Sequence, residues 1–568
     1  MKNYILIVLS ALLLFNTGCE VETIPYDSVS SEEVTGPDGL AAVTNGCYAY
    51  LKEEYFYKPY HYVPEFGGDN IALSGTTSDR LMNLYNYNRV IDNYHTQRLW
   101  EKSYLIIVTL NRLIESNETG VSPELDQILG EDHYLRAFLY LTLTNTFGRP
   151  YAQSPETNLA VPLKLTSDPD DTPARATVKE VYDQIVKDLL AAIDLMSEDK
   201  ASIYATKEAA QALLSRVYLY MGDNENAIKY ATDVMDSGRF TLLGNSDISN
   251  YFTYSPDENT ENIMAVKFVK DEDYLYNGWY TVGSMYANVD GAGWGEMYAS
   301  KPIRDLLNQN PEDQRIKFIE PQYESEASYT EGGQTIVVKN PMWYIFVEEV
   351  EDGSHIKSYF RTGLVVDDAG QWKLAEPDEN ISGTHVETEE VEGETKYFIT
   401  WKGEKQYVDI ERMMQTRQGY PKYYVLKCSK QQGQAHLWSP SISRLAEMYL
   451  NRAEGYAKQG NGDLALSDIN VLRQRAGIPT WDIDNLPLGK TVLDLVLEER
   501  RMELMFEGHR KFDIFRNGLT LDRHYPGTHD RGADNVVKMT VTPNDNAIVE
   551  YIPQLEIDRY PGDLQQNP

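Results

Sequence analysis

Four carboxylates lie close together in the segment LEERRMELMFEGHR, residues 497–510: Glu498, Glu499, Glu503 and Glu507. Such a group could supply the acid and base of glycoside hydrolysis, which needs two carboxyl groups facing each other across the bond, roughly 5 to 9.5 Å apart. Glu499 and Glu503 are one helical turn apart and point the same way, so they cannot straddle a sugar. The spacing instead predicts structural ion pairs: Glu498 with Arg501, Arg500 with Glu503, and Glu507 with Arg510 or Lys511.

No other catalytic or metal-binding signature is present. The chain has no G-x-S-x-G, H-E-x-x-H, C-x-x-C or phosphate-cradling loop, and its nine His residues do not cluster. We therefore predict a protein that is not an enzyme, with no cofactor and no metal site. A surface glycosidase is the less favoured alternative.

Side chains suited to binding gather between residues 67 and 88. The Gly-bounded loop GGDNIALSG is followed by a polar loop in which Tyr alternates with Asn. The side chains concerned are Asp69, Asn70, Arg80, Tyr85, Asn86, Tyr87 and Asn88. Exposed Tyr and Asn can stack on a polar ligand and hydrogen-bond to it. A hairpin that packs its own tyrosines explains the same pattern, so both interpretations remain open.

The overall charge limits the class of ligand. The 568 residues include 52 Lys and Arg against 87 Asp and Glu, which gives a net charge of −35. This field repels polyanions, so we expect no nucleic-acid partner and favour a neutral ligand. A local cluster of Arg412, Arg417, Lys422 and Lys427 could still form a basic pocket.

The elements that position these residues are mostly helices. Apolar residues recur at helical spacing in residues 100–118, and the sequence also predicts helices at residues 37–52, 130–148 and 491–507. A further amphipathic helix, residues 177–196, opens with Thr177 and Glu180, which form a capping box.

Two helical hairpins repeat one pattern. Tyr, Gly and Ala occur at the same spacing, Y-x3-G-x4-A, in both hairpins. The residues are Tyr218, Gly222 and Ala227 in the first hairpin, and Tyr456, Gly460 and Ala465 in the second. These offsets match the turn Gly and small second-helix Ala of a tetratricopeptide repeat. The fold class is thus mainly α, built on tetratricopeptide-like hairpins, although an ordinary helical hairpin can carry the same three residues.

The character of the chain changes between residues 245 and 434. Turn-rich segments alternate with short apolar runs such as NIMAVKFV and KYYVLKC, which predicts a loop-rich insert with short β-strands. Most of the Trp residues lie here, and loops on a rigid scaffold are common binding sites. We divide the chain into residues 1–18, a signal peptide, residues 19–240, an N-terminal helical region, and residues 241–568, a C-terminal region that holds the insert.

The first twenty residues form a targeting segment. A positive start at Lys2 precedes an apolar run, residues 5–15, that is too short to span a membrane. The run ends in NTGC, which resembles the lipobox of a bacterial lipoprotein although Asn16 stands where Leu is usual. We expect Cys19 to carry the lipid anchor. Cys47 and Cys428 could pair or remain separate buried thiols.

Several longer motifs together resemble the SusD/RagB family. They are RLAEMYLNRAEGYAKQG, NVLRQRAGIP, EERRMELMFEGHRKFDIFRNG and YIPQLEIDRYPGDLQQNP near the C-terminus, and GEDHYLRAFLY with FGRPY in the N-terminal half. The resemblance covers nearly the whole chain outside the insert. It implies a cell-surface lipoprotein of the outer membrane that captures oligosaccharides and delivers them, as a lid, to a SusC-like TonB-dependent transporter. In some branches of the family the ligand is a peptide, which is the alternative here.

The resemblance also indicates where a glycan would bind. In this family variable loops carry aromatic side chains that stack on sugar faces and polar side chains that bind hydroxyl groups. The corresponding loops are residues 67–88 and 274–294, with further contributions from Trp343 and from residues 361–372. We expect Tyr85, Tyr87, Trp279 and Trp294 to stack on the ligand, and Asp69, Asn70, Asn88 and Arg80 to hydrogen-bond to it. A scaffold that binds only other proteins is the rival function.

Overall fold

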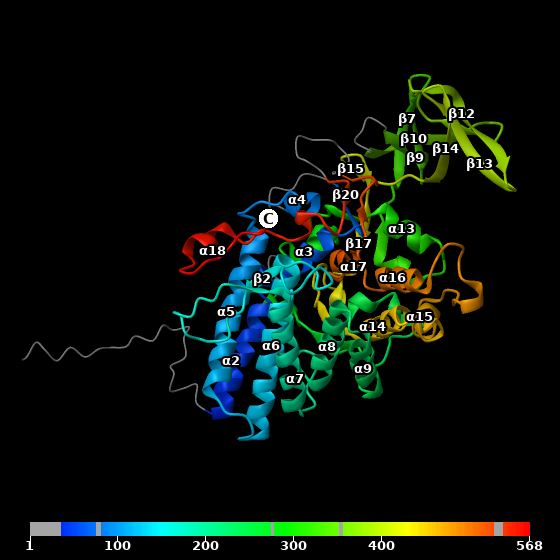
Figure 1. Cartoon of the computed structure of the whole chain (residues 1–568). Helices are drawn as coiled ribbons and strands as arrows, with labels where there is room; N and C mark the ends of the chain where they lie inside the picture. Colours follow the sequence, from blue (N-terminus) through cyan, green and yellow to red (C-terminus); the bar gives the residue numbers. More distant parts are fainter. Residues whose placement is uncertain (1–35, 75–80, 274–277, 351–355, 528–537) are drawn as a thin grey trace, which may run out of the picture.

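A computed structural model describes residues 36–74, 81–273, 278–350, 356–527 and 538–568 (Figure 1). Two helical blocks form the body of the molecule, and a β-rich unit from the middle of the chain stands away from them. The mainly α fold class is therefore confirmed. Cys19 and Arg80 lie outside the described residues.

The N-terminal block is a row of long helices that lie side by side in Figure 1. They are α2 (Gly36–Leu51), α5 (Tyr94–Ser116), α6 (Pro123–Phe147) and α7 (Val178–Leu195), with the aromatic helix α3 (Glu54–Phe66) packed on α5. Helix α6 is buried along most of its length because α5 and α7 cover it on two sides. The predicted capping box at the start of α7 is confirmed, since Thr177 and Glu180 bond reciprocally.

The two repeat hairpins meet although about 230 residues separate them. The first is α8 (Lys207–Met221) with α9 (Asn224–Asp236), and the second is α14 (Leu445–Lys458) with α15 (Gly462–Ala476). Helix α14 packs against α9 so closely that a Cβ on Gly455 would lie 2.8 Å from the Ile228 side chain. The turns at Gly222 and Gly460 have φ near +80°, which only Gly adopts at low cost.

The insert contains more regular structure than the sequence predicts. Strands β9 to β14 close into a six-stranded barrel, and β7 and β8 form a separate hairpin. The strands are β7 (Glu326–Glu331), β8 (Gln334–Lys339), β9 (Met342–Val350), β10 (Ile356–Val366), β11 (Trp372–Leu374), β12 (Ile381–Val391), β13 (Glu394–Trp401) and β14 (Glu404–Arg412). The exposed residues of these strands are largely polar or charged, so the strands do not appear in the sequence as continuous apolar runs.

Several Trp residues of the insert pack in the barrel core or at the base of the barrel. Trp401 is buried in the barrel core with Phe346, and Trp343 is buried where the barrel joins the body. Trp372 of β11 packs against the same core. The suggested contribution of Trp343 to ligand stacking is therefore wrong, because only 3% of its surface is exposed.

Short paired strands tie the loops to the body. The pairs are β1 (Ile71–Leu73) with β5 (Met297–Ala299), β2 (Leu159–Pro162) with β3 (Arg175–Thr177), β4 (Asn262–Ala265) with β18 (Ser441–Arg444), β6 (Ile319–Pro321) with β17 (Tyr423–Val425), β15 (Thr416–Arg417) with β16 (Tyr420–Pro421), and β19 (Leu521–Asp522) with β20 (Thr540–Val541). Cys47 and Cys428 are separate buried thiols and form no disulfide. In the parts of the chain that the structure describes, no helix is both long and apolar enough to cross a membrane.

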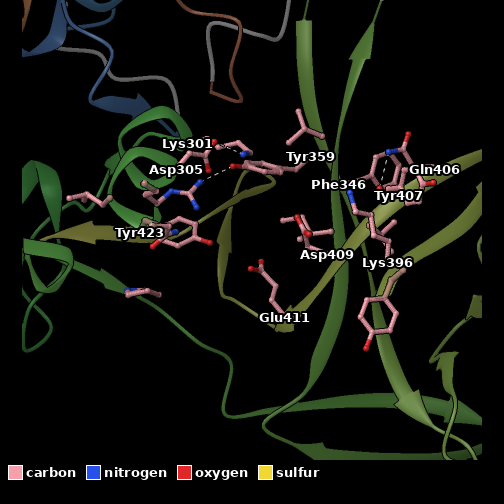
Figure 2. A pocket seen from close by; sticks show the side chains of 18 of the residues that line it. Lys301, Asp305, Phe346, Tyr359, Lys396, Gln406, Tyr407, Asp409, Glu411 and Tyr423 are labelled. Atoms are coloured by element: carbon pink, nitrogen blue, oxygen red, sulfur yellow. Dashed lines mark hydrogen bonds and ion pairs between the residues drawn. The ribbon is translucent and has the colours of Figure 1, made fainter. Parts of the chain in front are cut away.

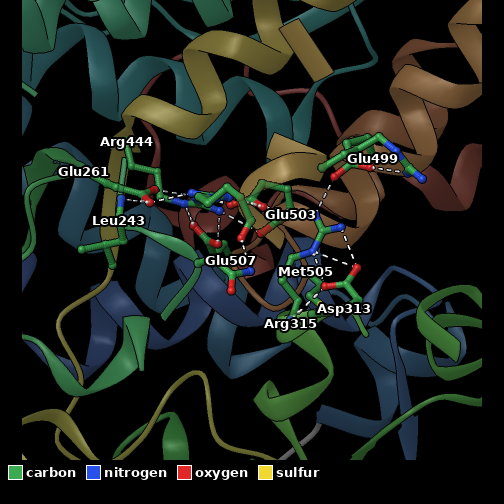
Figure 3. A network of polar contacts seen from close by, with 12 residues as sticks. Leu243, Glu261, Asp313, Arg315, Arg444, Glu499, Glu503, Met505 and Glu507 are labelled. Atoms are coloured by element: carbon green, nitrogen blue, oxygen red, sulfur yellow. Dashed lines mark hydrogen bonds and ion pairs between the residues drawn. The ribbon is translucent and has the colours of Figure 1, made fainter. Parts of the chain in front are cut away.

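A buried ionic network joins the C-terminal helices to the loops (Figure 3). At its centre Glu503, the last residue of α16 (Val492–Glu503), contacts Arg444 at 2.7 Å and Arg475 at 2.6 Å. Arg315 of the 3-10 helix η3 (Gln314–Phe318) lies 2.6 Å from Glu499 and 3.2 Å from Glu503. None of the network side chains is more than 8% exposed.

The network contains equal numbers of opposite charges. Its cations are Arg315, Lys427, Arg444, Arg473 and Arg475, and its anions are Glu261, Asp313, Glu499, Glu503 and Glu507. Equal charge matters because an unpaired buried charge costs several kcal/mol. Burial alone raises the pKa of Glu507, but Arg444 and Lys427 outweigh burial and lower that pKa to about 2.

The structural role predicted for the acidic segment is thus confirmed, but the predicted partners are wrong. Glu498 pairs with Lys490 at 2.6 Å, and Arg500 pairs with Asp513 at 2.8 Å. Glu503 and Glu507 bind cations from other elements rather than from their own segment. The i,i+3 and i,i+4 rule describes exposed helix faces, whereas α16 is packed between elements that supply their own charges.

We expect Glu503→Gln to lower the free energy of unfolding by about 3–5 kcal/mol, because it leaves Arg444 and Arg475 without their shared carboxylate in a buried setting. Glu498→Gln on the same helix is the matched control. Its side chain is 34% exposed and pairs only with Lys490, so the expected loss is about 0–1 kcal/mol. Urea unfolding of both variants measures the difference. Equal losses of unfolding free energy would contradict the proposed contribution of the network to stability.

The lowered pKa of Glu507 predicts sensitivity to acid. Its pKa in the folded protein, about 2, lies below the ordinary value of 4.5, so the stability it contributes is present above pH 4.5. That stability is lost as the pH falls from 4.5 to 2, and it amounts to roughly 3 kcal/mol. Denaturant unfolding between pH 7 and pH 3 should show a smaller loss for Glu507→Gln than for the unmodified protein. Parallel pH profiles would disprove the assignment.

Candidate ligand-binding site

A cavity of about 380 Å³ opens between the starts of α3 and α5 and the loop segment 279–296. Aromatic rings line it from all three sides: Tyr55, Tyr62, Tyr94, Trp279, Tyr280 and Trp294. Three of these rings are well exposed, with 41% of Tyr94 and 49% of both Tyr280 and Trp294 accessible. A group of exposed aromatic rings around one cavity is suited to a ligand with apolar faces and polar edges.

The two Trp residues are held in a fixed arrangement by Ser284 of the short helix α12 (Gly283–Tyr286). The backbone N–H groups of Trp294 and Gly295 donate to the Ser284 carbonyl at 2.7 and 2.9 Å. The Ser284 hydroxyl donates to the Trp279 carbonyl at 2.8 Å. The two indole rings meet edge to face, 5.3 Å apart at 81°. One serine therefore binds the backbone of both Trp residues.

Glycine on both sides of Trp294 permits this geometry. Gly293 has a φ of +102°, and a Cβ there would lie 2.3 Å from the Ala287 carbonyl oxygen. Gly295 has a φ of +54°, and its Cβ would lie 2.9 Å from the Tyr424 ring. Side chains at these positions would push the loop outward, so the two glycines let the backbone sit deep while the Trp294 ring projects outward.

The opposite wall is built around Arg98 of α5. Its guanidinium lies 5.2 Å from the Tyr55 ring and 5.3 Å from the Tyr94 ring, and the two rings meet edge to face at 6.0 Å. Burial and the neighbouring Tyr55 raise the pKa of Tyr94, so its hydroxyl stays neutral and can hydrogen-bond in either direction. Cation–π contacts of this kind orient exposed rings without burying them.

The charged groups around the cavity are already paired. Lys58 contacts Glu54 at 2.7 Å, and Arg98 contacts Glu101 at 2.6 Å. Glu296 contacts Arg417 at 2.6 Å, and Arg417 also donates to the Trp294 carbonyl at 2.7 Å. The cavity therefore offers no excess of either sign, which favours a neutral ligand.

The structure brings together only part of the predicted site. Trp279 and Trp294 line the cavity as expected. Tyr85 and Tyr87 are buried, 0% and 5% exposed, and the Arg523 guanidinium lies 4.1 Å from the Tyr85 ring. The prediction that these two tyrosines stack on a ligand is wrong. The alternative is right that they are buried, but they pack against C-terminal residues such as Arg523 and not within a hairpin of their own.

Polar residues of the same segment already bind side chains of the helical body. Asp69 pairs with Arg510 of α17 (Arg510–Arg516) at 2.6 Å, and Asn70 accepts a hydrogen bond from Arg501 at 2.9 Å. Burial raises the pKa of Asp69, but Arg501 and Arg510 outweigh it and hold that pKa well below its usual range. Asn88 is half-buried and does not line the cavity. The predicted hydrogen-bonding role of Asp69 and Asn70 is not supported, because β1 draws this segment into the core.

Tyr55, Tyr94 and Tyr280 line the cavity but were not among the predicted site residues. Tyr280 directly follows Trp279, and Tyr55 begins an aromatic run, so both had a local signal. Tyr94 stands alone in sequence and reaches the site only through the start of α5. Within the described ranges, His, Cys, Asp and Glu side chains do not gather in threes or more as a metal site would require. The basic pocket that the local cluster of Arg and Lys could have formed is absent, since Lys427 is buried beside Glu507 and Arg417 pairs with Glu296.

Comparison with known proteins identifies the fold. A family model described as "Starch-binding associating with outer membrane" matches residues 24–219, and the SusD family model matches residues 260–568. A SusD-like protein of Formosa agariphila is 24% identical over 562 residues, 92% of this chain and 96% of the relative.

Solved structures of other proteins have the same fold. A SusD superfamily protein of Bacteroides thetaiotaomicron superposes with a TM-score of 0.70 at 25% identity, covering 94% of this chain and 100% of the other. A laminarin-binding SusD-like protein shares the fold at a TM-score of 0.57 and 19% identity, covering 94% of this chain and 99% of the other. Since the SusD family model alone spans more than half of the sequence, this protein belongs to the SusD family of carbohydrate-binding, outer-membrane-associated proteins.

Proposed function

We propose that this protein is a cell-surface lipoprotein that captures neutral oligosaccharides in the aromatic cavity and delivers them to a SusC-like TonB-dependent transporter as its lid. The observation that carries the binding function is the cavity between α3, α5 and the 279–296 loop, with three exposed rings around it. Membership of the SusD family supports the same function.

The chemistry of the cavity favours a glycan. Sugar rings have apolar C–H faces that stack on Trp and Tyr, and hydroxyl edges that bind polar groups at the rim. Trp279 and Trp294 meet at a right angle, so a chain that turns between adjacent sugar units can contact both rings. The paired charges of Lys58, Arg98 and Glu296 leave no net attraction for a polyanion.

The carboxylates at the cavity support binding without turnover. Glu54 and Glu296 line it, but Glu54 pairs with Lys58 and Glu296 pairs with Arg417. A glycosidase needs one carboxyl group kept protonated as an acid and a second placed across the bond. Incubation with glycans should therefore release no new reducing ends.

Trp294→Ala is expected to weaken glycan binding about tenfold or more, because it removes one of the two most exposed rings of the cavity and its edge contact with Trp279, worth about 1.4 kcal/mol. Calorimetry against laminarin, starch, inulin and mannan measures the effect, with a uronic acid polymer as the charged comparison. Leu488→Ala is the surface control, since this fully exposed side chain does not line the cavity. Unchanged affinity in Trp294→Ala would place the ligand elsewhere.

Anchoring and delivery are tested separately in cells. Cys19→Ala should move the protein from the membrane fraction to the soluble fraction, because the acylated residue is lost. Gentle detergent extraction of the unmodified protein should copurify a large TonB-dependent transporter. Retention of Cys19→Ala in the membrane would disprove the anchor, and copurification of no transporter would disprove the partnership. Neither result would bear on glycan binding in the cavity.

A further inference from the structure

A second and larger cavity, about 940 Å³, lies between the barrel and the helical body (Figure 2). The body side consists of α13 (Lys301–Asn308), β6 and β17. The barrel side consists of β9, β10, β13 and β14. We call this cavity the barrel cleft. Sites between two structural units are frequent places for ligands in proteins.

The barrel cleft is held open by a defined junction. Trp343, Ile345 and Met414 form a buried apolar cluster at the base of the barrel. Above this base, the Arg304 guanidinium of α13 stacks 3.6 Å from the Tyr423 ring and donates to the Tyr359 hydroxyl of β10 at 2.8 Å. The cleft is therefore bounded by contacts between the two units.

The barrel wall presents a regular polar face. Successive side chains of a strand alternate between faces, so Tyr407, Asp409 and Glu411 of β14 point to the same side and all line the cleft. Asp409 is the register partner of Ile345 on β9, which places this row beside the junction. Two rings are well exposed at the cleft, Tyr407 at 44% and Tyr323 at 42%.

The charged groups of the lining are nearly balanced, and apolar side chains such as Ile316, Pro321 and Val347 lie among them. Three cations and four carboxylates contribute: Lys301, Arg304 and Lys396, with Asp305, Glu394, Asp409 and Glu411. Tyr rings with many hydrogen-bonding groups and little net charge match a polyhydroxylated ligand.

We propose that the barrel cleft is a second saccharide-binding surface, which contacts the same glycan chain that occupies the aromatic cavity. This inference rests on the proposed glycan-binding function. It adds that the protein recognises a long chain at two places, so affinity increases with chain length beyond what the aromatic cavity can hold.

The chain connectivity brings the two sites within reach of one ligand. Glu411 lines the barrel cleft, and Arg417, six residues later, donates to the Trp294 carbonyl in the wall of the aromatic cavity. Six residues span at most about 22 Å, so the backbone positions of Glu411 and Arg417 are no farther apart than that. A polysaccharide can bridge such a span, and the second contact then forms at high effective concentration.

The test uses the whole protein and calorimetry with laminarin, starch, inulin and mannan, each as polymer and as trisaccharide. Tyr407→Ala combined with Asp409→Ala should weaken binding of the preferred polymer about tenfold and leave trisaccharide binding unchanged. Trp294→Ala should weaken both forms. Glu404→Ala, on the same strand but outside the cleft lining, is the matched control. Tyr407→Phe should retain polymer binding because the ring is kept.

The outcomes separate this inference from the proposed function. If the cleft variant binds polymer as the unmodified protein does, while Trp294→Ala is impaired, the barrel cleft is not a saccharide site and the aromatic cavity still is. If the cleft variant loses polymer binding and Trp294→Ala does not, the cleft is a site and the assignment of the cavity fails. If no glycan binds the unmodified protein and a peptide mixture does, both proposals are overturned.

Discussion

The requirement that every buried charge be neutralised governs the C-terminal half of this protein. Arg315, Arg444 and Glu503 come from three separate parts of the sequence and are almost completely excluded from water. Each is stable there only if its partners arrive in the correct position, because desolvation of a single unpaired ion costs several kcal/mol. The helices, the short β4–β18 ladder and η3 are therefore fixed relative to one another.

This fixed frame allows the binding loops to be irregular. The segment 279–296 has little regular structure, and it is positioned by local bonds to Ser284, by close packing of Gly293 and Gly295, and by Arg417. Loops of this kind can change sequence without disturbing the ionic network. The Trp pair depends on the frame, but the frame does not depend on the Trp pair.

More of the fold than of the site could be predicted from the sequence. Capping residues such as Thr177, turn glycines such as Gly222 and the repeated Tyr-Gly-Ala pattern each act locally, so their effect is visible in the sequence. The barrel was not predicted, since the exposed sides of strands such as β12 are polar or charged and closure depends on pairing between distant residues. Tyr85 and Tyr87 were wrongly predicted for the same reason, because contacts with distant residues decide their position. Nothing near them in sequence indicates that Arg523, more than 400 residues away, covers their rings.

The way the barrel begins and ends has an evolutionary consequence. Met342 at the start of β9 and Arg412 at the end of β14 are register partners, so the barrel leaves the body and returns to it at adjacent points. Cα atoms of such partners are about 4.5–5.5 Å apart. For the path of the chain through the helical body, the 69 residues between these partners take the place of a single hairpin turn. The whole module can therefore be exchanged, enlarged or deleted between relatives while the path of the remaining chain stays the same.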